Sequence, residues 1–229
     1  MITAMPRPCS TQILFLTDKT PGDVRTLLAG FSQRYVTDWD LWSTAAAAGG
    51  QRKVITLREI LRRWQATRVH VKGRIMRRPK WQARHEPPYL DDLVGLAEVQ
   101  LAGLGQLSVR DLADASDAAV LPLIGLWDIF VHLTTLDDAS CVGISKAVML
   151  LSDGRFGPAL DRIAKKNLHI RAAPAMARDW IGCLRCVSED IRAFEARHRL
   201  VLESLLPVPS PNVGGGHIYD MLVGPRERN

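Results

Sequence analysis

The side chain of this sequence best placed for chemistry is a single carboxylate between a glycine-proline loop and a short basic segment. Asp161 follows residues 156–160, Phe-Gly-Pro-Ala-Leu, and stands about one helical turn before Lys165 and Lys166. Gly143 lies 18 residues earlier, in an expected tight turn before a helix that starts at Ile144. Backbone amides at such a helix start bind phosphate, and a glycine lets the phosphate approach closely. Asp161 is the carboxylate expected beside such a phosphate, although its side chain could instead cap the following helix.

The spacing of apolar residues predicts that mostly helices position this region. Thr56 is expected to begin one helix, because Glu59 stands at capping-box spacing, and Ser108 and Asp111 repeat that spacing. Residues 12–16 are a possible short strand, and 45–50 are expected to be flexible. The expected helices span 56–64, 89–104, 108–115, 116–133 with a kink at Pro122, 144–151, and 180–206.

The chain is long enough for one large domain or two small ones. Its 229 residues are 47% hydrophobic and 24% charged, which is ordinary globular composition. We expect a less regular, basic and aromatic N-terminal region at 1–88, a helical domain at 89–211 and a C-terminal tail at 212–229, with glycines 214–216 as a flexible link. The expected fold class is mainly α.

Composition also sets expectations for the compartment. No apolar run reaches the roughly 18 residues of a membrane span, and the N-terminus lacks the pattern of a signal peptide. The four cysteines show no disulfide framework, which favours a reducing environment. We therefore expect a cytoplasmic protein without a membrane partner.

Charge is distributed very unevenly along the chain. Residues 52–84 carry twelve Lys or Arg side chains against Glu59 alone, residues 86–138 are strongly acidic, and residues 146–199 are basic again. A basic stretch rich in arginine, which grips phosphate with a planar fork, favours contact with a polyanion such as nucleic acid. Arg74, Arg77, Arg78 and Lys80 are the candidate phosphate contacts there; the alternative is a solvated charged face.

Residues 136–171 resemble the helix-hairpin-helix DNA glycosylase superfamily. In that family a Leu-Pro-Gly-Val-Gly hairpin precedes a glycine-proline loop and the catalytic aspartate. Here Gly143 matches the second hairpin glycine, Ala147 matches a hairpin alanine, and Asp161 matches the aspartate. The resemblance implies a helical bundle in which the hairpin, here Gly143, Ser145 and Lys146, binds a DNA phosphate. It further implies that Asp161 stabilises an oxocarbenium-like sugar of a flipped nucleotide and activates water, with Lys165 and Lys166 adding phosphate contacts.

Three departures from the family pattern limit the kind of glycosylase that the resemblance implies. Ser140 and Cys141 replace the hairpin proline and first glycine. Members that also cleave the strand carry a lysine where this chain has Ser145, so the resemblance implies a monofunctional glycosylase with Lys146 as a phosphate contact. Only two cysteines follow the aspartate, so no iron–sulfur cluster, metal or other cofactor is expected.

Three further pairs of side chains each allow two interpretations. Trp39 and Trp42 are candidates for stacking on an extruded base, or are buried core residues. Cys183 and Cys186 have the spacing of half a zinc site, but on a helix they share one face. His217 and Asp220 could be a ligand pair or have no joint role.

Two function classes follow. The first is a DNA glycosylase that hydrolyses the N-glycosidic bond of a damaged, mismatched or modified base in double-stranded DNA, with a nucleoid-associated location. The second is a non-catalytic helix-hairpin-helix DNA-binding protein.

Overall fold

The computed structural model describes residues 13–64, 66, 90–131, 141–207 and 213–226. Within these ranges the chain forms nine α-helices, two short 3-10 helices and no strand, apart from an isolated bridge between Phe31 and Arg226. The mainly α expectation is confirmed. The helices are α1 (Pro21–Ala29), α2 (Gln33–Ala48), α3 (Gly50–Arg63), α4 (Leu90–Gly103), η2 (Val109–Asp111), α5 (Leu121–Phe130), α6 (Cys141–Leu151), α7 (Arg162–Asn167), α8 (Ala177–His198), η4 (Leu202–Leu205) and α9 (Gly215–Val223).

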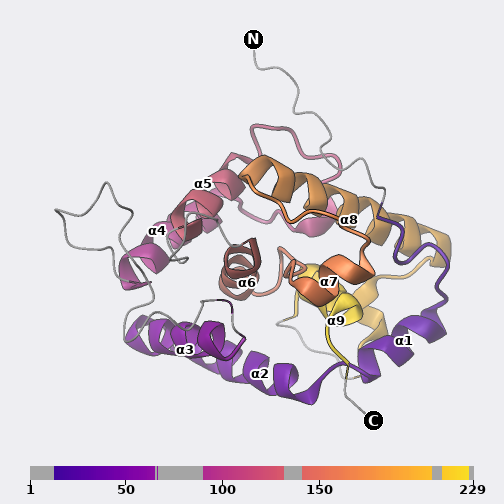
Figure 1. Cartoon of the computed structure of the whole chain (residues 1–229), viewed down its shortest axis with the longest axis horizontal. Helices are drawn as coiled ribbons and strands as arrows, with labels where there is room; N and C mark the ends of the chain where they lie inside the picture. The colour runs from indigo at the N-terminus through magenta and orange to yellow at the C-terminus, as the bar shows by residue number, and fades with distance from the viewer. Residues whose placement is uncertain (1–12, 65, 67–89, 132–140, 208–212, 227–229) are drawn as a thin grey trace.

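Helix α6 is the centre of the fold. Ten of its eleven residues are buried, and Val142 is the exception. Its sequence is apolar on nearly every side, and a helix of that kind is most stable when other elements surround it. Figure 1 shows α6 in the middle of the molecule, with α2, α3, α4, α5 and α8 around it and α7 and α9 beside it.

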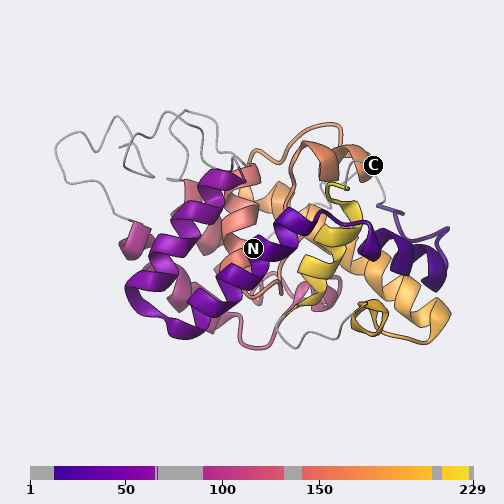
Figure 2. The same ribbon diagram turned by 90° about the horizontal axis from the view of Figure 1, so that it is seen from below.

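The N-terminal region belongs to the same core. Helices α2 and α3 lie side by side (Figure 2), and Gly49 and Gly50 both have positive φ at the reversal between them. A single cluster of buried apolar side chains runs from Ile13 through α2, α3 and α6 to Val223 in α9. The division expected at residue 88 is therefore not a division of the hydrophobic core.

The C-terminal segment differs most from the sequence-based expectation. Glycines 214–216, expected to be a flexible link, lead into and begin α9, whose residues 215–219 and 221–223 are buried. This helix packs on α1, α7, η2 and η4. Its glycines allow close backbone approach, because a Cβ atom on Gly216 would lie 2.3 Å from the Gly157 amide nitrogen.

Several expected helix boundaries are corrected. Thr56 lies inside α3 rather than at its start, since α3 begins at Gly50. The stretch 45–48, expected to be flexible, completes α2, and no strand forms at 13–16. Pro122 stands in the first turn of α5, where proline needs no kink. The capping box of Ser108 and Asp111 is present, on a 3-10 turn.

Candidate active site

The turn before α7 is held by side chains from two other helices. The Leu160 amide donates to Ser145 Oγ on α6 at 3.0 Å, and the Ala159 amide donates to Asp220 Oδ1 on α9 at 2.9 Å. Ser145 Oγ in turn donates to the Cys141 carbonyl at 2.6 Å. Consecutive amides of one turn are thus satisfied by buried or partly buried side chains, which fixes the position of the next residue, Asp161.

Asp161 is the N-cap of α7 and has one oxygen left over. Its Oδ1 accepts from the Ile163 amide at 2.9 Å and the Ala164 amide at 3.0 Å. Its Oδ2 lies 3.7 Å from Lys146 Nζ, and the side chain remains 22% exposed. The prediction that Asp161 caps the following helix is confirmed. Capping uses only Oδ1, so Oδ2 can interact with other groups.

Lys146 is a buried lysine beside this carboxylate. The residue is 5% exposed, and Nζ donates to the Trp64 carbonyl at 3.1 Å while lying 5.8 Å from the Trp64 ring centroid. Trp64 is fixed in turn, since its Nε1 donates to Asp38 Oδ2 at 2.7 Å and Asp38 pairs with Arg63 at 2.6 Å. The ammonium group therefore faces the protein interior.

This geometry corrects the expected phosphate-binding hairpin at Gly143, Ser145 and Lys146. Helix α6 already begins at Cys141, so Gly143 is a buried helical residue and the turn expected at residues 142–143 is absent. Ser145 and Lys146 are buried, and their polar atoms bond within the protein. The physical reason is the apolar character of the whole stretch, which favours burial of the helix from its first turn.

Two further ionisable side chains, Asp220 and Tyr35, complete the cluster; Asp220 is predicted from the sequence only as half of a possible ligand pair with His217, and Tyr35 is not predicted to have a role. Burial raises the pKa of Asp220 to about 7, with help from the negative charge of Asp161 and against the Ala159 hydrogen bond and Lys146. Burial also raises the pKa of Tyr35 on α2, and the charges of Asp161 and Asp220 act in the same direction. Lys146, Asp161, Asp220 and Tyr35 thus form one electrostatic cluster, which we call the Asp161 cluster.

Basic side chains lie next to this cluster on α7. Lys166 is exposed and Lys165 is half-buried, so both remain candidates for phosphate contact. Both lysines stand in the last turn of α7, the end of a helix where a positive charge is favourable. The other candidates, Arg74, Arg77, Arg78 and Lys80, lie outside the described residues.

The tryptophans expected to stack on a base are in the core. Trp39 is 4% exposed and stacks on His217 at 3.7 Å between ring centroids, with the rings 10° from parallel. Trp42 is fully buried, and its Nε1 donates to the Leu150 carbonyl at 2.8 Å. The stacking prediction for both is wrong for this structure, because neither ring presents a face to solvent. Burial lowers the pKa of His217 to about 3, so this imidazole is neutral at ordinary pH.

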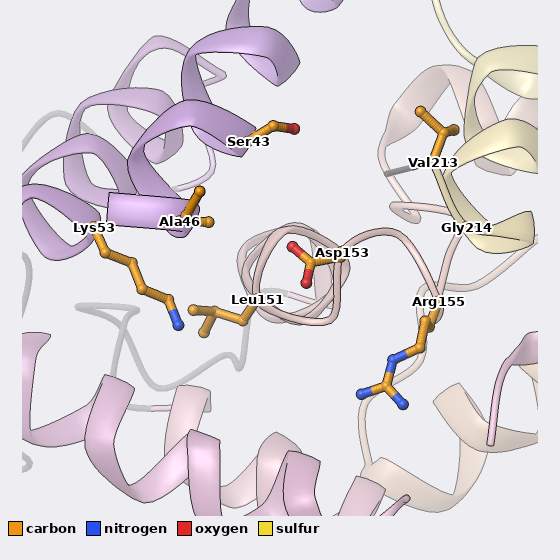
Figure 3. A pocket seen from close by; sticks show the side chains of 9 residues that line it. Ser43, Ala46, Lys53, Leu151, Asp153, Arg155, Val213 and Gly214 are labelled. Carbon is orange, nitrogen blue, oxygen red and sulfur yellow. The ribbon is translucent and has the colours of Figure 1, made fainter. Parts of the chain in front are cut away.

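A cavity of about 470 Å³ lies at the other end of α6. Figure 3 shows Ser43 and Ala46 on one side, Val213 and Gly214 on the other, and Asp153 between them. A second cavity, of about 430 Å³, is lined by Arg110 and residues near it. Neither is lined by Asp161.

Other classes of site have less support. Among the described residues, no three His, Cys, Asp or Glu side chains come together as a metal site, and Cys183 and Cys186 lie on α8. The described helices include none long and apolar enough to cross a membrane.

Comparisons with protein-family models, curated proteins and solved structures found no match to this chain. The chemistry of the Asp161 cluster is that of a fixed carboxylate whose charge is balanced by a buried ammonium.

Proposed function

We propose that this protein is a monofunctional DNA glycosylase. The observation that carries the proposal is the environment of Asp161. Its Oδ1 is engaged by two α7 amides, its Oδ2 lies 3.7 Å from Lys146, and 22% of the side chain stays exposed. A carboxylate fixed in this way needs little reorganisation when positive charge develops beside it.

In the proposed reaction Asp161 stabilises the sugar cation of a flipped nucleotide. The bond between the sugar C1′ and the base nitrogen breaks, and its electron pair leaves with the base. A water oxygen then bonds to C1′, and Asp161 accepts the proton that this water loses. That proton passes to the departed base, which returns Asp161 to its ionised form. The products are the free base and an abasic site in otherwise intact DNA.

The position of Lys146 supports water, rather than an amine, as the nucleophile. A lysine that attacks C1′ must approach the sugar, whereas Nζ of Lys146 is occupied by the Trp64 carbonyl and by Asp161. We assign Lys146 the role of keeping Asp161 in place and balancing its charge. This assignment replaces the phosphate contact expected from the sequence.

Double-stranded DNA is the proposed partner. The exposed Lys166 and the half-buried Lys165 on α7 lie on the segment that begins at Asp161, so a duplex bound there places its backbone beside the carboxylate. Each basic group that neutralises a phosphate releases counterion, so we expect binding to weaken as salt rises.

An abasic-site assay tests the proposal. The protein is incubated with plain, deaminated, alkylated, oxidised and phage-type hypermodified duplexes, and alkali-dependent strand breaks are counted. Asp161→Asn is the decisive variant, because asparagine caps a helix about as well as aspartate and therefore preserves the fold. Asp111→Asn, at the distant cap of η2, is the matched control. Breaks on one substrate that Asp161→Asn abolishes and Asp111→Asn retains are the expected result.

The second candidate is a DNA-binding protein without catalysis. It is favoured by one observation, that the two cavities described above are not lined by Asp161. Salt-sensitive duplex binding without strand breaks on any of the five substrates would establish this candidate over the first.

A further inference from the structure

Asp220, on the C-terminal helix α9, accepts a hydrogen bond from the turn that precedes Asp161. Helix α9 lies beside α7 and packs against it (Figure 1). The two helices are joined by a hydrogen bond that Asn167 Nδ2 donates to the Val223 carbonyl at 2.8 Å. The Ala159 amide that Asp220 accepts lies two residues before Asp161. The Asp220 carboxylate therefore helps to hold the turn that positions Asp161.

We propose that Asp220 is a positioning residue for Asp161 that acts by fixing the turn at residues 159–161 and by adding its own charge to the cluster. The inference rests on the proposed function, since the property it explains is the reactivity of Asp161. It goes beyond that function by naming a second carboxyl group that touches neither base nor sugar.

The charged and titratable neighbours of Asp220 come from three directions. Asp161 lies before α7, Lys146 lies on α6, and Tyr35 lies on α2. Asp161 opposes ionisation of Asp220 and Lys146 favours it, while burial makes the largest contribution and raises the pKa to about 7. The net charge of the cluster therefore changes by one close to neutral pH.

This change has a direct consequence for the reaction. When Asp220 is protonated, the Lys146 ammonium is balanced mainly by Asp161, and less negative charge is available to a sugar cation. When Asp220 ionises, it takes part of the attraction of Lys146 and adds negative charge near Asp161. The ionised form carries the activity, so the rate rises about tenfold between about pH 6 and about pH 8, following the ionised fraction of one group.

Asp220→Asn separates the charge from the hydrogen bond. Its amide oxygen still accepts from the Ala159 amide, but it does not ionise. Single-turnover excision is measured from about pH 5.5 to about pH 8.5 in the full chain. We expect the rise with pH in the parent and its disappearance in Asp220→Asn. Asp220→Ala, which also loses the hydrogen bond, is expected to be slower than Asp220→Asn at every pH.

Asp153→Asn is the matched control. Asp153 is another aspartate whose pKa burial raises, but it stands beside the cavity at the far end of α6, and asparagine tolerates its φ of 50°. This variant is expected to keep the rise with pH. An Asp220→Asn profile identical to that of the parent overturns the inference.

A second readout does not need activity. In the carboxyl-carbon NMR spectrum of the full chain, the Asp161 signal should show a step near pH 7 that vanishes in Asp220→Asn, because the neighbouring charge no longer changes. A parent protein that excises no base but shows this step contradicts the proposed function and leaves the coupling of Asp220 to Asp161 intact. An Asp161 signal that is the same in both proteins contradicts the coupling itself.

Discussion

Two groups on α9, the half-buried Asp220 and the buried His217, should make the stability of this protein depend on pH in opposite directions. Asp220 has a pKa raised from 3.8 to about 7, and His217, three residues earlier, has a pKa lowered from 6.5 to about 3. The perturbation we consider is Asp220→Asn, which removes the first effect and leaves the second.

The sign follows from the protons bound in each state. Between pH 3.8 and about 7 the folded protein keeps a proton on Asp220 that the unfolded chain has lost, so this group's contribution to the free energy of unfolding falls as pH rises. Between about 3 and 6.5 the unfolded chain binds a proton on His217 that the folded protein excludes, so that contribution rises with pH. In the parent the two nearly cancel between about pH 4 and about pH 6.5.

The magnitude is large enough to measure. One proton of difference changes the free energy of unfolding by about 1.4 kcal/mol per pH unit, so the window of Asp220 corresponds to at most about 4 kcal/mol. Removing Asp220 should expose a rise of at most about 3 kcal/mol between about pH 4 and about pH 6.5, which is the His217 contribution alone.

The assay is urea unfolding followed by tryptophan fluorescence at four pH values across this range, using the six tryptophans of the chain. We expect the free energy of unfolding to rise more steeply with pH in Asp220→Asn than in the parent, and less steeply in His217→Gln than in the parent. Parallel profiles in the parent and Asp220→Asn would refute the reasoning, because Asp220 would then titrate alike in the folded and unfolded states.

Three further predictions concern the turn, the lysine and the glycines. Ser145→Ala leaves the Leu160 amide without its acceptor, and we expect a loss of about 1–3 kcal/mol in urea unfolding together with slower excision; unchanged values for both would contradict the role of this hydrogen bond. Lys146 should form no covalent adduct, so borohydride treatment during turnover should trap no protein–DNA complex, and a trapped complex lost in Lys146→Met would reverse its assigned role. Gly216→Ala should lower the melting temperature sharply, because the new Cβ would lie 2.3 Å from a backbone nitrogen. Gly95→Ala has open space around it and should be neutral or stabilising. Equal effects of the two substitutions on the melting temperature would contradict the packing of α9.

Helix α4 and the cap of α7 could be predicted from the sequence, because both depend on residues close together in the chain. The α4 prediction matches within a residue or two, because charged and apolar residues alternate at helical intervals between 90 and 103. The capping role of Asp161 is confirmed, since an aspartate before a short helix satisfies its first amides whatever the rest of the fold.

Features that depend on tertiary packing were not predictable in this way. The sequence of α9 is short and begins with glycines, which locally suggests a tail; the close approach to Gly154 and Gly157 that explains those glycines joins segments about 60 residues apart. Lys146 looked like a surface cation because lysine is usually exposed, and only the Trp64 carbonyl and Asp161 explain its burial. Asp220 joins the site through a hydrogen bond to Ala159, 61 positions away, which no spacing rule contains.

The proposed function assigns base excision to Asp161. It is tested most directly by the abasic-site assay on the five duplex substrates with the parent protein, Asp161→Asn and Asp111→Asn. We predict alkali-dependent breaks on one substrate that are lost in Asp161→Asn, while duplex binding and a cooperative unfolding transition are retained. Breaks that persist in Asp161→Asn, or no breaks with any substrate in the parent, would contradict the claim.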